Sequence, residues 1–188
     1  MDRRESEYVM ALEVAQLGQP VLRARAEEIA SEAIRSTDFQ EFLAQMQATL
    51  AEQKGVGLAA PQVFVSLRLF LAAILPPTEP NGMPRVEAFI NPQLTFLTDE
   101  KKAAWEGCLS FPELLVLVPR PRAVRIEYLN ANGEPCARDL VDFPARVVQH
   151  EFDHLDGILT LDRAASTRDI IKASEIGTVL GDKDDDDE

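Results

Sequence analysis

The spacing of apolar residues predicts two main helices in this chain. Between about residues 38 and 53, apolar side chains recur at helical spacing, Asp38 stands where a cap is needed, and Gly55 can end the helix. A second helix is expected over residues 143–156, with Gly157 at the position after its end. Apolar residues surround much of this second helix, so we expect it to be buried.

The segments between the two helices contain strand patterns. Asn91 and Pro92 indicate an edge strand or a bulge, and Asn132 followed by Gly133 is a hairpin signal. Strands in hairpins followed by a helix favour an α+β domain over a doubly wound parallel sheet. The four expected strands cover about residues 68–75, 88–96, 124–128 and 138–141.

Length and composition are those of a soluble globular protein. The chain has 188 residues, 46% hydrophobic and 27% charged, which fits one domain with a sizeable core. No apolar run is long enough to span a bilayer, and the first residues do not resemble a secretory signal. We therefore expect a cytoplasmic protein that does not enter membranes.

The charge distribution argues against a partner with many negative charges. The formal net charge is −13, so the chain repels polyanions, and we expect no direct binding to nucleic acid. Residues 182–188 hold six acids and one lysine. This segment has too few apolar residues to fold, and we expect it to be a disordered acidic tail.

Both histidines of the chain lie in one short segment, His150-Glu151-Phe152-Asp153-His154. On a helix, such positions share a face with Cβ atoms about 5–6 Å apart, so both imidazoles can bind one metal ion. The glutamate beside the first histidine can then act as a general base on a water. The alternative is a pair of hydrogen-bonded core histidines. Ligand spacing inside an apolar helix favours the metal site, because a buried ionisable cluster is costly without a partner.

A catalytic metal usually has three protein ligands, and no third histidine exists. A carboxylate or a thiolate must therefore supply the third bond. Cys108 follows Gly107, which allows close backbone approach, although a small buried hydrophobic role is the alternative. Cys136 lies beside the expected hairpin turn, and we interpret it as structural or incidental.

Three segments of the chain resemble, in order and in rough spacing, the signature motifs of the peptide deformylase family. They are GVGLAAPQ at 55–62, EGCLS at 106–110 and QHEFDHL at 149–155. Residues 18–23 also resemble the N-terminal segment of the family, and the similarity runs from about residue 14 to about 162. The resemblance implies an α+β fold with antiparallel sheets packed around a central helix that carries the two histidines.

The resemblance also implies a metal site and a reaction. Cys108, His150 and His154 would bind Fe²⁺, for which Zn²⁺, Ni²⁺ or Co²⁺ can substitute, and Glu151 would be the acid and base. The reaction would be hydrolytic removal of the N-terminal formyl group from formyl-methionine of newly made polypeptides, with release of formate. The catalytic domain would span residues 1–165, followed by a C-terminal extension over 166–188.

Further residues would contact the substrate, which is an N-formylmethionyl peptide or nascent chain. Gln62 would donate its side-chain amide, and Leu109 its backbone N–H, to the formyl oxygen. Val56 and Gly57 would lie along the substrate backbone. Some bacterial relatives dock on the ribosome through a basic C-terminal helix, but the acidic end of this chain is unsuited to that contact.

Several nearby residues are candidates for supporting roles. Asp153, Glu106 and Arg120 are candidates for orienting the histidines, with ordinary salt bridges as the alternative. Trp105 and Phe143 could each line a methionine pocket or pack in the core, and we favour core packing for Trp105. Two departures from the family motifs leave peptide preference open, namely the bulky Phe111 and the apolar pair Leu114 and Leu115.

Two rival functions remain. In the first, the chain is a metallopeptidase whose third ligand comes from downstream, where Glu175 is the only glutamate near a helix-like segment. In the second, it is a non-catalytic binding protein that retains the deformylase fold. The intact Gln62, Cys108 and Glu151 argue against the second alternative.

Overall fold

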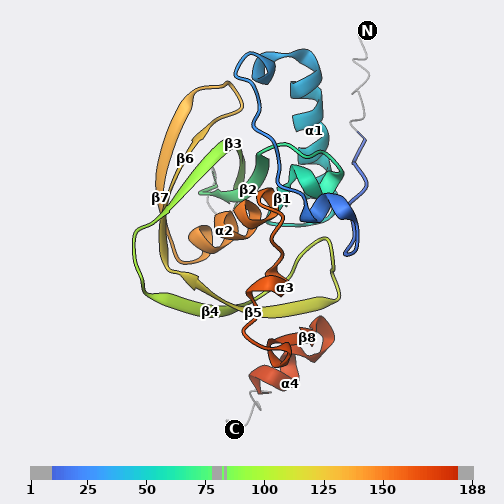
Figure 1. Cartoon of the computed structure of the whole chain (residues 1–188), viewed down its shortest axis with the longest axis vertical. Helices are drawn as coiled ribbons and strands as arrows, with labels where there is room; N and C mark the ends of the chain where they lie inside the picture. Colours follow the sequence, from blue (N-terminus) through green and yellow to red (C-terminus); the bar gives the residue numbers. More distant parts are fainter. Residues whose placement is uncertain (1–9, 78–81, 83, 182–188) are drawn as a thin grey trace.

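A computed structural model describes residues 10–77, 82 and 84–181 (Figure 1). The expected acidic tail at 182–188 lies outside these residues. The α-helices are α1 (Thr37–Glu52), α2 (Phe143–Leu155), α3 (Thr160–Arg163) and α4 (Ile176–Leu180). The strands are β1 (Gly57–Ala59), β2 (Leu69–Leu75), β3 (Arg85–Phe96), β4 (Lys101–Glu106), β5 (Leu114–Pro121), β6 (Ala123–Leu129), β7 (Pro135–Val141) and β8 (Ile170–Lys172).

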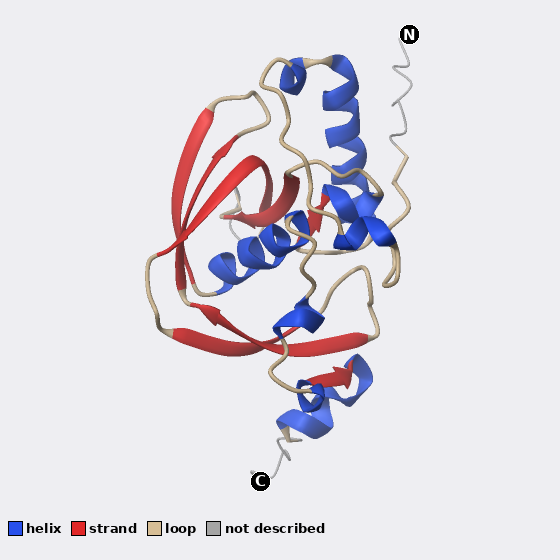
Figure 2. Cartoon of the chain, in the orientation of Figure 1, coloured by secondary structure: helices blue, strands red, loops and turns tan. Residues whose placement is uncertain are grey.

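The strands form two antiparallel sheets (Figure 2). The larger sheet has the order β1-β2-β3-β6-β7, and the smaller has the order β4-β5-β8. Helix α2 contacts β1 and β2 of the larger sheet and β5 of the smaller one. The expected α+β class is confirmed, since hairpins make up both sheets and helices pack against them.

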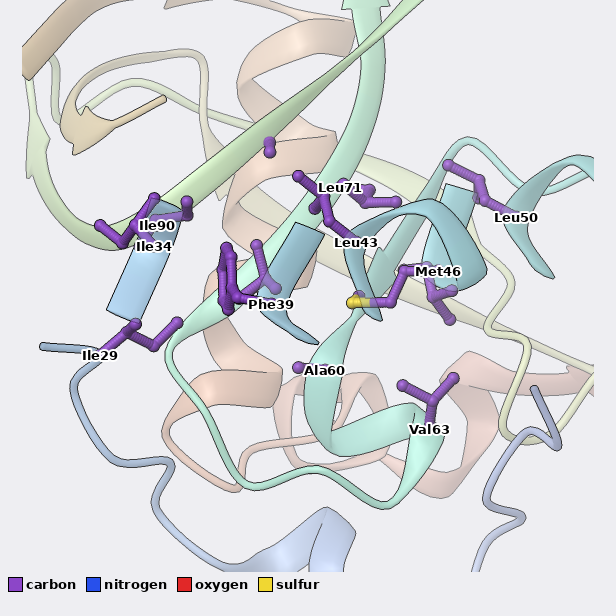
Figure 3. Close-up of a cluster of buried hydrophobic side chains, with 13 residues drawn as sticks. Ile29, Ile34, Phe39, Leu43, Met46, Leu50, Ala60, Val63, Leu71 and Ile90 are labelled. Atoms are coloured by element: carbon purple, nitrogen blue, oxygen red, sulfur yellow. The ribbon is translucent and has the colours of Figure 1, made fainter. Parts of the chain in front are cut away.

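Strand β2 shows how the larger sheet is covered on both faces. Leu69 and Leu71 belong to the buried cluster that α1 covers, which Figure 3 shows in close-up. Phe70 and Ala72 belong to the cluster on the opposite face, together with side chains of α2. Alternate residues of a strand point to opposite faces, so both sets must be apolar. This explains why 69–75 is a continuous apolar run.

The expected elements are found with small differences. Helix α1 is capped by Ser36, whose hydroxyl accepts a hydrogen bond from Phe39 N at 3.2 Å, so the predicted cap at Asp38 was wrong. The β3–β6 register shifts between Ile90 and Gln93, which confirms the bulge. Strand β3 lies inside the sheet and is not an edge.

Four strands were not expected, namely β1, β4, β5 and β8. Strand β8 pairs with β5 through Leu114–Lys172, Leu115–Ile171 and Val116–Ile170. The smaller sheet therefore includes residues beyond 165. Among the residues that the structure describes, no helix is long and apolar enough to cross a membrane.

Candidate metal centre

Cys108 and the two histidines converge beside α2. Cys108 lies in the loop between β4 and β5, while His150 and His154 lie one turn apart on α2. The potential ligand atoms of these three residues all lie within 4.8 Å of one another. Cys108 Sγ is 3.4 Å from His154 Nε2, and all three side chains are buried or nearly so. Glu175 lies elsewhere, exposed in the short turn Ala173–Glu175.

Glu106 fixes the orientation of His150. Its Oε2 lies 3.0 Å from His150 Nδ1, which leaves Nε2 of the same ring to face the ligand cluster. Arg120 donates to both carboxylate oxygens of Glu106, at 2.7 and 3.0 Å. Burial opposes ionisation of Glu106, but the hydrogen bonds with His150 and Arg120 lower its pKa to about 2. Glu106 is therefore a carboxylate at neutral pH and favours an Nδ1–H on His150.

Arg120 also joins this carboxylate to a second one on α2. Its Nη1 lies 2.8 Å from Asp153 Oδ2, and Asp153 accepts a further pair of hydrogen bonds from Arg163. Glu106, Arg120 and Asp153 were all candidates from the sequence, and the structure brings them together. Arg146 was missed, although it stands one turn before His150, and it donates to Glu106 from the pocket side at 2.5 Å.

We expect Arg120→Leu to lower the free energy of unfolding by about 3 kcal/mol or more, because it leaves two buried carboxylates without their shared partner. Chemical denaturation measures this. The matched control is Arg125→Leu, which removes an exposed ion pair with Asp139 and should cost less than about 1 kcal/mol. Equal losses in both variants would contradict a structural role for the buried network.

Glu151 is a buried carboxyl beside the ligand cluster. Its side chain packs so closely on Gly57 that a Cβ added at Gly57 would overlap the carboxylate. Glu151 Oε2 has no hydrogen-bond partner among the described residues. Burial raises the pKa of Glu151 to about 7, with His150 and Arg120 acting in the opposite direction. A carboxyl with such a pKa can both accept and release a proton near neutral pH.

Gln62 presents its amide group to the same cavity. Its Oε1 accepts from Ala59 N at 2.9 Å, which directs Nε2 towards Ser110 Oγ at 3.2 Å and Cys108 Sγ at 3.5 Å. The Leu109 N–H donates to no other residue in the described part of the chain. The Gln62 amide thus reaches the sulfur of Cys108, and the N–H of the next residue has no acceptor of its own.

One pocket of about 390 Å³ is lined by Gln62, Cys108, Leu109, His150 and Glu151, whereas the buried His154 is not part of its lining. Its walls are mainly apolar, and Trp105 belongs to them, so Trp105 takes the pocket position that we considered and not the core packing that we favoured. Phe143 and Val56 lie at the rim, with exposed fractions of 58% and 48%. Phe111 does not line this pocket and packs in a buried cluster that also contains Cys108.

The residues present fit a divalent transition metal. One sulfur and two imidazole nitrogens form a donor set suited to Fe²⁺, Co²⁺, Ni²⁺ or Zn²⁺ and unsuited to Mg²⁺. Burial, together with repulsion from His150 and Arg120, holds the pKa of His154 well below its usual range, so this ring is a neutral ligand. Three protein ligands leave a position for water, as in catalytic sites.

Sequence comparison relates this chain to known deformylases. The family model for polypeptide deformylase matches residues 11–169. Peptide deformylase 2 of Nostoc sp. is 42% identical over 166 residues, covering 87% of this chain and 92% of the relative. A peptide deformylase of Thermotoga neapolitana is 43% identical over 148 residues, which cover 78% of this chain and 82% of the relative.

The solved structures to which this fold is similar are also peptide deformylases. The Met-Ala-Ser complex of the class I type b peptide deformylase from Acinetobacter baumannii superposes with a TM-score of 0.76 at 35% identity, covering 82% of this chain and 99% of that one. The Thermotoga maritima peptide deformylase superposes with a TM-score of 0.74 at 37% identity. The match covers 83% of this chain and 99% of that one. The chain therefore belongs to the polypeptide deformylase family of metal-dependent hydrolases.

Proposed function

We propose that this protein removes the N-terminal formyl group from formyl-methionine of newly made polypeptides and releases formate. The observation that carries the proposal is the convergence of three kinds of group. The ligand atoms of Cys108, His150 and His154 lie within 4.8 Å of one another, and the Glu151 carboxyl and the Gln62 amide line the same pocket as Cys108 and His150. Formyl is the smallest acyl group, so its carbonyl meets the least steric hindrance in approaching these side chains.

A bound ion would supply a water of lowered pKa and polarise the formyl oxygen. Glu151 accepts a proton as the water oxygen attacks the formyl carbon, and it returns that proton to the departing amine as the C–N bond breaks. Gln62 Nε2 and the Leu109 N–H donate to the formyl oxygen as it gains negative charge, each contributing on the order of 3 kcal/mol. The products are formate and a free methionine amine.

The peptide backbone would add to the free edge of the larger sheet. Strand β1 is the edge strand, and Val56 precedes it at the pocket rim. An extended peptide can pair with such an edge through main-chain hydrogen bonds, which are independent of side chains. We propose that Val56 and Gly57 align the substrate in this way, as the family motif implies.

We expect Gly57→Ala to reduce kcat/KM for a formyl-Met peptide at least tenfold, because the new Cβ displaces the Glu151 carboxyl from its place. Formate release measures this. Metal content should stay unchanged, because none of the three ligand side chains lies among the atoms that the new Cβ would meet. A fully active Gly57→Ala enzyme would show that the position of Glu151 does not matter.

We propose Fe²⁺ as the native ion, with Zn²⁺, Ni²⁺ or Co²⁺ able to replace it. The sulfur of Cys108 supports an ion of this group, because soft ligands retain such ions and not Mg²⁺. The choice of iron within the group follows from the family resemblance. Metal analysis of anaerobically purified protein tests the proposal. Zinc in place of iron under those conditions would overturn it.

We further propose a catalytic domain over 1–165 in the cytoplasm, with 166–188 as an extension. Nascent chains near the ribosome would be its substrates, without docking through a basic C-terminal helix. The short α4 and the acids that follow it in the sequence support the last point. Cosedimentation with ribosomes before and after removal of 182–188 tests it, and binding that depends on this segment would contradict it.

The decisive experiment is formate release from formyl-Met-Ala-Ser by the anaerobically purified protein, with acetyl-Met-Ala-Ser as the control substrate. Turnover of the formyl peptide alone supports deformylation. Turnover of neither peptide by metal-loaded protein would overturn the proposed function.

A further inference from the structure

Helix α1 ends beside the pocket in a way that fixes the backbone of one lysine. The N–H of Lys54 donates to Ala51 O, and the N–H of Gly55 donates to Leu50 O, both at 3.2 Å. Together with a φ of 52° at Lys54, these bonds form the Schellman motif. Glycine is the usual residue at this left-handed position, yet the chain carries a long cationic side chain there.

Lys54 lies at the outer end of the segment expected to guide the substrate. Gly57 touches Glu151 at the base of the pocket, Val56 is half-exposed, and Lys54 is exposed while still lining the same cavity. These residues therefore lead from the reacting centre outwards. An extended peptide advances about 3.3 Å per residue, so a peptide paired with this segment passes Lys54 with its second or third residue.

The charge of Lys54 is not neutralised by its surroundings. Among the described residues, no carboxylate lies within 4 Å of its ammonium group. Arg146, another cationic side chain of this pocket, is paired with Glu106. The remaining walls are mainly apolar, with Leu109, Pro112 and Phe143 among them. Between these two cationic side chains of the described pocket lining, Lys54 is therefore the one that has no carboxylate partner.

We propose that Lys54 makes this enzyme prefer N-formyl peptides with an acidic side chain at the second or third residue. The inference rests on the proposed deformylase function and names its substrate class. It runs against the average charge of the molecule, because a net charge of −13 alone would favour basic peptides. A preference for acidic peptides would therefore have a local origin.

The test compares kcat/KM for amidated formyl-Met-Ala-Glu, formyl-Met-Glu-Ala and their lysine counterparts at low salt. For the wild type we expect the better glutamate peptide to exceed its lysine counterpart severalfold, as for an exposed charge pair. Lys54→Glu should reverse the preference, so that the ratio of kcat/KM for the glutamate peptide to that for the lysine peptide changes on the order of tenfold. About 0.5 M salt should reduce the wild-type preference, because salt screens exposed charges. The matched control Lys101→Glu makes the same charge change on exposed β4, away from this pocket, and should leave the ratio unchanged.

Three outcomes would overturn the inference. They are a wild-type preference for lysine peptides, an unchanged ratio in Lys54→Glu, and an equal change in Lys101→Glu, which would indicate an effect of net charge. Lys54→Gln serves if the reversed charge prevents folding, and it should abolish the preference. Failure of the wild type to hydrolyse any formyl peptide, including neutral formyl-Met-Ala-Ser, would instead overturn the proposed function.

Discussion

Replacing Glu151 by glutamine is expected to lower kcat/KM for formyl-Met-Ala-Ser by about 10²–10⁴-fold, the usual contribution of a general acid and base. Glutamine keeps the shape of the side chain, so it should still pack against Gly57. It cannot accept the proton of the attacking water or return it to the amine. Formate release under saturating metal measures the loss.

Two further measurements make the Glu151→Gln result specific. Metal content should match the wild type, because Glu151 is not among the three converging ligands. The free energy of unfolding should not fall, since an amide is easier to bury than a carboxylate without a partner. The matched control Glu41→Gln lies on the exposed side of α1 and should keep full activity. Near-wild-type turnover by Glu151→Gln would remove the proposed acid and base.

Replacing Cys108 by alanine is expected to remove the metal and, with it, the activity. Only two imidazoles would remain, and a site with two protein ligands binds divalent ions far more weakly than one with three. Replacing a residue that hydrogen-bonds to a metal ligand typically lowers metal affinity about 10–100-fold, and the loss of a ligand itself should exceed this. Metal analysis after dialysis against a weak chelator measures it, together with formate release.

Cys136→Ala is the matched control for this prediction. Cys136 is half-buried on β7, and it belongs to the apolar cluster on the α2 face of the larger sheet. That variant should retain its ion and its activity. Full metal content in Cys108→Ala, with loss in Glu175→Ala, would favour the metallopeptidase alternative, although Glu175 is exposed in a separate turn.

Local periodicity was enough to predict part of this molecule. Helices α1 and α2 have strong apolar spacing, and the ligand spacing of His150 and His154 follows from one helical turn. The hairpin of β6 and β7 was predictable because its turn residues are diagnostic. In each of these cases the signal lies within a few consecutive residues.

Strand β5 was missed for a physical reason. Pro119 and Pro121 lack the N–H that a central strand needs, so they argue against a strand. In the structure, β8 pairs only with residues 114–116 of β5, while β4 pairs with residues 116–121. The prolines therefore have a neighbouring strand on one side only. Strand β1 was missed because three residues are too few to show a period.

The site could be assembled from sequence only through family resemblance. Gln62 and Cys108 are separated by 46 positions and meet through the tertiary fold, which no local pattern encodes. The same holds for Arg120, which connects Glu106 on one sheet with Asp153 on the helix. Arg146 had a detectable signal, because it precedes His150 by one helical turn.

The pairing of β8 with β5 has a practical consequence for shortened forms of the protein. A chain cut at residue 165 would lose β8 and leave the backbone N–H and C=O groups of residues 114–116 without partners on that side. Unpaired strand edges are templates for self-association. Such a truncation would therefore tend to form oligomers next to the loop that carries Cys108, with fewer accessible active sites, even though every signature motif is still present.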